Sequence, residues 1–145
     1  MLAAADDVEN AEEFTMKSRI SLLLVLVFVS TANAQDLRKG GSVFARVESN
    51  GDVRIKGSVV GRFESDGDIR VKGSVVGRIE KDGDIRKKGS IVGRVEKNGD
   101  VRISGSIVGR IESDGDIRRN GSVIGRAAGV MKEQAAAIFF FGFFD

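Results

Sequence analysis

Residues 59–73 read VVGRFESDGDIRVKG, and this pattern decides the fold. The same 16-residue unit recurs five times almost unchanged between residues 50 and 125, and a degenerate earlier copy lies at residues 36–49. A unit this short cannot bury an apolar face by itself, so it must pack against its neighbours. The sequence therefore predicts a repeat domain of six units.

Each unit predicts a β-hairpin. Two short runs rich in β-branched residues flank a Ser-Asp-Gly turn at residues 65–67, and Lys-Gly at residues 72–73 marks a second turn. A three-residue loop pairs Phe63 with Ile69 and separates an apolar face from a charged face, whereas a two-residue loop mixes them. We therefore expect the three-residue loop, with Gly67 in the left-handed conformation that such loops need.

The same register predicts ion pairs on the charged face. It places Glu64 diagonal to Arg70, and Arg62 diagonal to Asp68. Cross-strand pairs of this kind contribute roughly 0.2–1 kcal/mol each. We expect them to set the register and the solubility more than the stability.

The register also predicts the core, as three rows of apolar residues at equivalent places in successive units. The position of Val71 is occupied by Lys87 and Arg119 in other copies, so we leave it outside the core. Gly61 follows Val60 and predicts a bulge or a point of close packing. The three rows are Val53, Ile69, Ile85, Val101 and Ile117; Val47, Phe63, Ile79, Val95 and Ile111; and Phe44, Val60, Val76, Val92, Val108 and Ile124.

An isolated hairpin is marginally stable in water, so the arrangement of the hairpins decides the fold. Six hairpins in series can close radially, stack as a solenoid or form one long meander. Closure hides the edge strands that would otherwise recruit other chains. We therefore predict an all-β fold of tandem hairpins closed radially, with a β-solenoid as the alternative. The repeat domain is assigned to residues 35–128.

Residues 16–34 have the three parts of a secretory signal peptide. A short basic start precedes an apolar run of 11 residues, and Ala32 and Ala34 supply an A-x-A cleavage site. A transmembrane helix needs about 20 apolar residues, so no span is expected in the mature chain, although a retained N-terminal anchor is the alternative. Residues 1–15 carry five acids and no base, and we interpret them as a mis-assigned extension ahead of Met16.

The C-terminal segment, residues 129–145, breaks the repeat. It reads GVMKEQAAAIFFFGFFD and holds five phenylalanines, a large apolar load to leave in water. We expect the segment to pack on the repeat domain and close an open end. Two alternatives are an interfacial lipid anchor and a partner-binding segment, which includes contact between copies in a homo-oligomer.

The composition narrows the chemistry. The chain has no His and no Cys, which excludes the usual zinc sites and the Ser–His and Cys–His nucleophiles. Lys and Arg number 23 against 21 Asp and Glu, and the two signs alternate within each unit, unlike a nucleic-acid-binding surface. We predict no enzymatic activity, no catalytic or cofactor-binding residues, no metal site and no nucleic-acid partner.

Three ligand hypotheses compete with a purely structural role for the charged residues. Glu64, Asp66 and Asp68 form an acidic cluster of the kind that binds Ca²⁺, but Asn50 and Asn98 replace the first Asp elsewhere, which favours turn formation. Glu64 and Asp68 also resemble an acid–base pair, yet the pair recurs in every copy. Two rows of arginines could face an anionic polymer: Arg62, Arg78, Arg94 and Arg110, and Arg54, Arg70, Arg86, Arg102 and Arg118.

The repeat, with the consensus GSVVGRIESDGDIR, resembles the repeats of bacterial secreted four-fold β-flower proteins, whose pattern is NGxxVGxIesdGxI. The segment GRAAG at residues 125–129 and the Phe-rich ending are also similar to that family. The resemblance covers residues 36–144 and implies a radial array of hairpins, export and no assigned enzymatic activity. This chain differs in having six units and Ala45 where the other units have glycine.

These observations predict an exported, non-enzymatic structural or binding protein of the cell envelope. Its expected location is secreted or periplasmic in a Gram-negative bacterium, with outer-membrane association left open. The alternative is an adhesin-like module that binds an anionic glycan or lipopolysaccharide through the arginine rows. Function is expected where the repeat pattern fails, in the deviant first unit and the Phe-rich segment.

Overall fold

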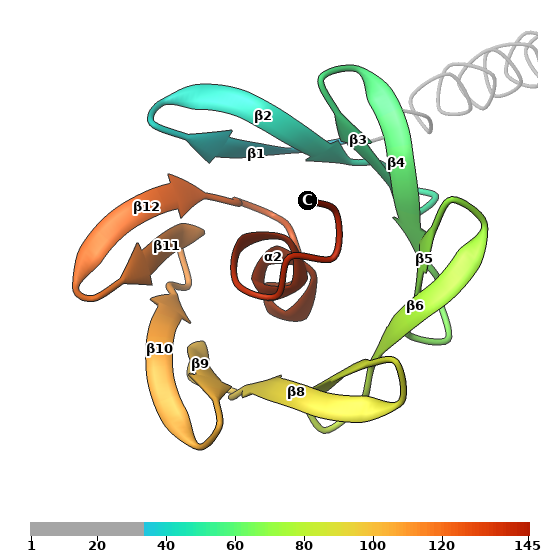
Figure 1. Ribbon diagram of the computed structural model, residues 1–145. Helices are drawn as coiled ribbons and strands as arrows, with labels where there is room; N and C mark the ends of the chain where they lie inside the picture. The colour runs from blue at the N-terminus through green and yellow to red at the C-terminus, as the bar shows by residue number, and fades with distance from the viewer. Residues whose placement is uncertain (1–33) are drawn as a thin grey trace, which may run out of the picture. The chain divides into compact units, whose positions relative to one another are not determined.

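The computed structural model describes residues 34–145, which form a closed antiparallel barrel (Figure 1). Strand β1 pairs with both β2 and β12, so the ring has no free edge. The predicted radial closure is confirmed and the solenoid is excluded. The strands are β1 (Gln35–Lys39), β2 (Ser42–Val47), β3 (Asp52–Ile55), β4 (Ser58–Phe63), β5 (Asp68–Val71), β6 (Ser74–Ile79), β7 (Asp84–Lys87), β8 (Ser90–Val95), β9 (Asp100–Ile103), β10 (Ser106–Ile111), β11 (Asp116–Arg119) and β12 (Ser122–Arg126).

Two N-terminal predictions lie outside the described residues. These are the extension at residues 1–15 and, except for Ala34, the signal peptide at residues 16–34. Both stay predictions.

Six hairpins splay outward around the ring, and we call each of them a petal (Figure 1). A petal joins an odd-numbered strand to the next even-numbered strand through a two-residue tip, as Lys56 and Gly57 join β3 to β4. Both tip residues have positive φ, 51° and 83°, which matches the right-handed twist of the strands. Five of the six petals have a Lys, Ser or Asn at the first tip position, and β1–β2 has Gly40.

Neighbouring petals are joined by the predicted three-residue turns. Between β4 and β5 the partners are Phe63 with Ile69 and Arg62 with Arg70, which confirms the predicted register. Gly67 has a φ of 98°, and a Cβ there would collide with the Ile79 carbonyl. The Ile79 N–H donates to the Gly67 carbonyl at 2.8 Å, so this turn also ties one unit to the next.

The predicted irregularity lies at Val60. The β3–β4 register moves from Val53 opposite Gly61 to Arg54 opposite Val59, which leaves Val60 without a partner. The same shift recurs in the other petals. The bulge turns the outer half of each strand pair away from the barrel and lets the petal splay.

The core follows the three predicted rows. Val53, Ile69, Ile85, Val101 and Ile117 are fully buried, at 0% exposure. In the second row Val47, Phe63, Val95 and Ile111 are buried, and Ile79 is half-buried. The third row is half-buried and packs against the first two.

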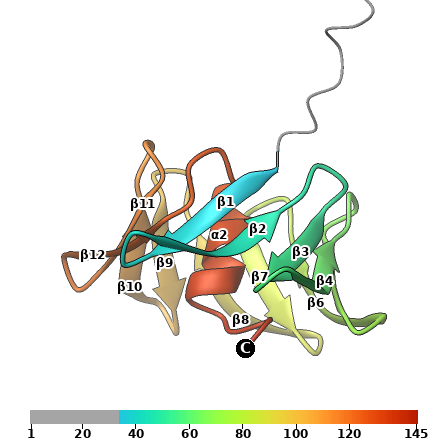
Figure 2. The same ribbon diagram turned by 90° about the horizontal axis from the view of Figure 1, so that it is seen from above.

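The barrel is filled by its own C-terminal segment. Helix α2 (Lys132–Phe139) lies inside the ring of strands, as the two perpendicular views show (Figures 1 and 2). Ala135, Ala136 and Ala137 are fully buried, because small side chains allow a helix to fit within the barrel. In the described part of the chain, the helix is too short to cross a membrane.

Candidate functional site

The five phenylalanines of the C-terminal segment fit five glycines of the barrel wall. A Cβ at any of these glycines would overlap a phenylalanine ring, so each glycine forms a socket for one ring. Successive rings contact successive units in the reverse of chain order. The pairs are Phe139 with Gly125, Phe140 with Gly109, Phe141 with Gly93, Phe143 with Gly77, and Phe144 with Gly61.

The deviant first unit supplies no sixth socket. Ala45 occupies the position equivalent to Gly61 and is buried at 3% exposure. The adjacent Phe44 stands where the other units have Val or Ile, and its ring meets that of Phe139 edge to face, with centroids 5.3 Å apart. The repeat pattern explained neither the first unit nor the Phe-rich segment. The structure shows that these two regions contact each other. The sequence carried this signal as five phenylalanines matched to five glycines.

Three basic side chains reach inward to the segment. Lys87 donates from Nζ to the Phe141 carbonyl at 3.2 Å, and Arg119 donates to the Phe139 carbonyl at 3.0 Å. Lys39 Nζ lies 5.5 Å from the centroid of the Phe139 ring and 4.5 Å from that of Phe44. Cations at the carboxyl end of a helix interact favourably with its dipole, and α2 has no basic residue in its own last turn.

Val71 itself lies outside the core, as predicted, but the residues at its position in other units contact the core or the C-terminal segment. Basic residues in other copies favoured an outward position, but Lys87 and Arg119 point inward there. Ile55 and Ile103, at the same position, pack against the core. The basic side chains are tolerated there because the helix end offers them carbonyl acceptors.

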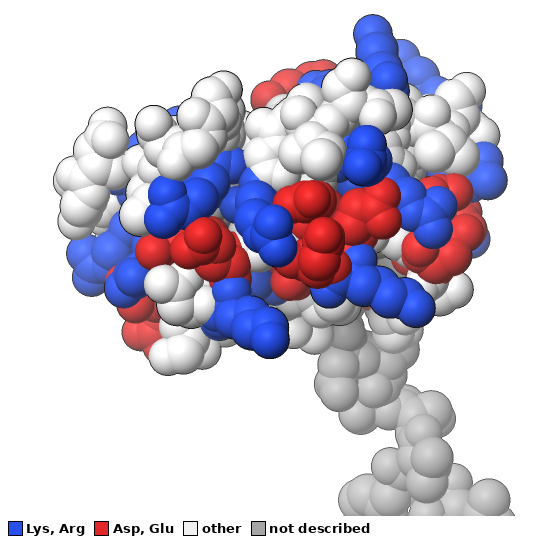
Figure 3. Space-filling model, turned by 90° about the horizontal axis from the view of Figure 1, so that it is seen from below, with Lys and Arg blue, Asp and Glu red and all other residues white. Residues whose placement is uncertain are grey.

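The outer face of the barrel is a belt of ion pairs, seen as interleaved basic and acidic side chains in Figure 3. The predicted pair between Arg70 and Glu64 is present at 2.9 Å. The predicted pair of Arg62 with Asp68 is wrong, because Arg62 pairs with Asp52 at 2.6 Å. Asp52 lies directly opposite Arg62 within the petal, which is closer than a diagonal neighbour across the turn.

The ion pairs occupy every member of the two predicted arginine rows. Arginines of the second row also donate to the glycine carbonyl at a petal tip, as Arg54 does to Gly57 at 3.1 Å. The guanidinium groups therefore hold the petals in shape. An anionic polymer would have to compete with acids that are already paired with these arginines. The ion pairs therefore weaken the hypothesis that the arginine rows bind an anionic glycan.

The acidic turns are also used within the protein. The Asp68 N–H donates to Asp66 Oδ1 at 3.0 Å, the local bond that stabilises such a turn. Glu64 and Asp68 lie in separate ion pairs, with Arg70 and Arg78. Among the residues described, three acids never gather as a metal site. The arrangement suits turn formation, and each of the two carboxylates has an arginine partner of its own.

Among the described residues, the folded structure lowers the pKa of two carboxyl groups, those of Asp100 and Asp52. Asp100 is buried, and its Oδ1 accepts a hydrogen bond from Arg110 Nε at 2.7 Å while its Oδ2 accepts one from Asn98 at 3.1 Å. These bonds, led by that from Arg110, lower the pKa of Asp100 although burial opposes them. Arg62 lowers the pKa of Asp52 in the same way, with Asn50 in the role of Asn98. The Asn substitutions therefore supply a donor to the carboxylate two residues later.

No family model, curated protein or solved structure matches the chain. The resemblance to β-flower proteins therefore stays a prediction. Any function has to be inferred from the geometry of the barrel and its surface.

Proposed function

We propose that the protein is an exported, non-enzymatic structural or binding protein of the cell envelope. The observation that carries the proposal is the self-filled barrel, in which five rings of the chain's own C-terminal segment occupy five sockets. A barrel that is already full has no lumen for a substrate. Any ligand or partner therefore meets the outer surface.

The charge pattern supports the same proposal. The arginines of the repeats are held in ion pairs, and the acids in turns and ion pairs, so the charged groups serve the scaffold. A protein without cysteine has no disulfide to protect it outside the cell, and here closure and packing supply the stability. The export part of the proposal comes from the signal-peptide pattern at residues 16–34.

Fractionation of the tagged full chain in a Gram-negative host tests the proposal. We expect the protein in the periplasm or the medium. Its measured mass should be that of a chain that begins at Gln35. Replacement of Leu23 and Leu24 by Asp in the apolar run should retain the unprocessed chain in the cytosol. Unprocessed wild-type protein in the cytosol would contradict export.

The glycan alternative has a test of its own. Heparin and lipopolysaccharide columns at low salt should not retain the mature protein, because the arginines are paired. Retention that is lost on the Arg94→Gln change would revive that alternative.

A further inference from the structure

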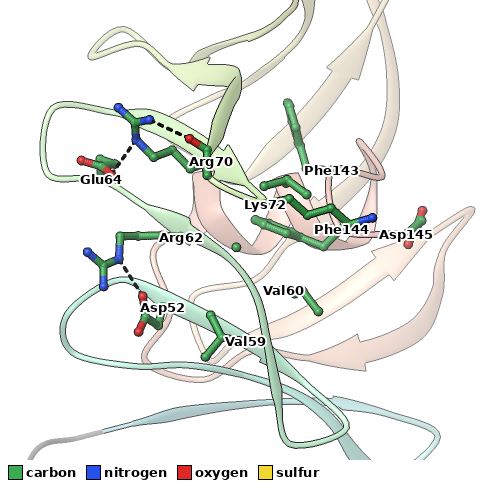
Figure 4. A pocket seen from close by; sticks show the side chains of 13 residues that line it. Asp52, Val59, Val60, Arg62, Glu64, Arg70, Lys72, Phe143, Phe144 and Asp145 are labelled. Atoms are coloured by element: carbon green, nitrogen blue, oxygen red, sulfur yellow. Dashed lines mark hydrogen bonds and ion pairs between the residues drawn. The ribbon is translucent and has the colours of Figure 1, made fainter.

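A cleft opens between the petals β3–β4 and β5–β6 (Figure 4). Its volume is about 540 Å³, within the range of small-molecule sites. Val59 and Val60 form one wall, Val71 lies on the other strand, and the rings of Phe143 and Phe144 form the floor. The cleft is therefore apolar along its depth.

This cleft is larger than two equivalent ones. The clefts beside β8 and β10 have volumes of about 310 and 360 Å³, and neither is lined by a residue of the C-terminal segment. Between β6 and the end of β7, the Lys88 N–H donates to the Val76 carbonyl at 3.1 Å. Among the described residues, Lys72 and Val60 form no equivalent bond, and Phe143 and Phe144 line their cleft.

The mouth of the cleft is basic. Arg62 and Arg70 line it but are paired with Asp52 and Glu64. Lys72 also lines it, and within residues 34–145 no carboxylate lies within ion-pair distance of its ammonium group. Its side chain extends across Phe144 (Figure 4). An acid, Asp145, lines the end of the cleft beyond Phe144.

The petal tips on both sides of the cleft add positive charge at a conformational cost. Lys56, Lys72 and Lys88 occupy tip positions with φ near 50°, where Asn or Gly is the favoured residue. Such a conformation is unfavourable for a residue with an ordinary side chain. Asn120 and Ser104 show that neutral residues serve at the same position. The two petals that flank the cleft, with Lys56 and Lys72, therefore carry lysine without a structural need for it, and so does the next petal, with Lys88.

We propose that this cleft binds a single-chain anionic amphiphile. The acyl chain lies along the valines and on the phenylalanine rings, and the anionic head meets the ammonium group of Lys72. This inference deepens the binding part of the proposed function but does not depend on export. Binding by the purified protein and its location in the cell are measured separately, so one can fail without the other.

Calorimetric titration of the purified mature chain with monomeric decanoate tests the proposal. Decanol and decyltrimethylammonium, with the same chain and a neutral or cationic head, are the comparison ligands. We expect decanoate to bind at a ratio of one to one and at least about tenfold more tightly than decyltrimethylammonium.

The repeat supplies matched variants. Val71→Lys introduces a lysine, as Lys87 has at the equivalent position of the next unit, so the fold should tolerate the change. It should weaken decanoate binding by about tenfold or more. Ile103→Lys makes the same change in another unit and should leave the affinity within about twofold. Circular dichroism melts of both variants confirm that they fold.

The head group is tested by Lys72→Ser, which copies Ser104. It should weaken decanoate binding about three- to tenfold and leave decanol binding unchanged. Asp145→Asn should tighten decanoate binding, because it removes a like charge. Equal loss in the Val71 and Ile103 variants, no decanoate binding, or binding to anionic lipid vesicles without binding of monomeric decanoate would overturn the proposal.

Discussion

At the scale of single residues, the socket glycines are selected by contact with the C-terminal rings. Gly77 does not have a positive φ, so a methyl group there is excluded by the Phe143 ring and the Arg86 carbonyl, with no contribution from backbone strain. Ala45 is the natural exception, because no ring of the C-terminal segment requires its position. The same residue type therefore has a different role here from Gly67, whose φ of 98° matters as well.

We predict that Gly77→Ala lowers the free energy of unfolding by roughly 1–3 kcal/mol, the usual cost of an overpacked core. Chemical denaturation measures this. Phe143→Leu should cost less in the Gly77→Ala background than in the wild type, which a double-mutant cycle detects. Ala45→Gly is the control and should cost less than about 1 kcal/mol. Equal effects of the two changes would disprove the socket.

The pH dependence of stability follows from Asp100 and Asp52. Their pKa values are lowered by folding, so the unfolded chain binds more protons than the folded chain near the ordinary pKa of about 3.9. The stabilisation is present above that pH and is lost as the pH falls through the folded pKa. We expect the free energy of unfolding to drop below about pH 4, as urea titrations at several pH values would show.

Asp100→Asn is the variant that isolates this effect. It keeps the shape of the side chain and removes its titration, so stability should fall less steeply with acid than in the wild type. Asn98→Ala removes the amide donor to Asp100 Oδ2 and keeps the Arg110 bond, so it should reduce the steepness by less than Asp100→Asn does. An unaltered acid profile in Asp100→Asn would show that this carboxyl does not contribute.

At the scale of elements, the sequence predicted the loop at residues 65–67 and its register, because a slip of one residue would have mixed the faces. It did not identify the petal as the hairpin that splays outward, since Lys56 and Lys72 are not typical residues for a tip with positive φ. The ion pair of Arg62 was misassigned for the same reason. Arg62 pairs with Asp52 on the opposite strand of the same petal, whereas the prediction looked for its partner across the three-residue turn.

Helix α2 depends on the barrel for its stability. It is short and has no side-chain cap at its start, so the barrel must hold it. Lys87→Met removes a cation from its carboxyl end and should lower the free energy of unfolding by roughly 0.3–1 kcal/mol, less at high salt. Lys88→Met changes the neighbouring exposed side chain and is the control. A cost for Lys87→Met that salt does not reduce would contradict the electrostatic explanation.

At the scale of the whole molecule, the repeat alone does not determine how many units close the ring. Local pattern predicted strands, faces and core rows, because each depends on a few neighbouring residues. The number of units depends on the match between the width of the barrel and the segment that fills it, which involves residues more than half the chain apart, such as Phe144 and Gly61. We therefore infer that the C-terminal segment, through its five phenylalanine side chains, determines that the barrel closes with six units.

Deletion of residues 84–99 tests this match, because it removes one full unit and keeps the repeat in phase at Gly83 and Asp100. Barrel diameter grows roughly in proportion to strand number, so a ring of five units is too narrow for α2 and its rings. The Phe141 ring also loses its socket at Gly93. We expect the C-terminal segment to leave the barrel, become sensitive to protease and cause association between copies.

The control replaces residues 84–99 with a second copy of residues 68–83, which restores six units and the socket. That chain should be a monomer by size-exclusion chromatography, with a protected C-terminal segment and a melting temperature near that of the wild type. A five-unit chain that behaves like this control would show that the C-terminal segment does not determine the number of units in the barrel. The opposite result would establish that this segment, although outside the repeat, sets the size of the ring.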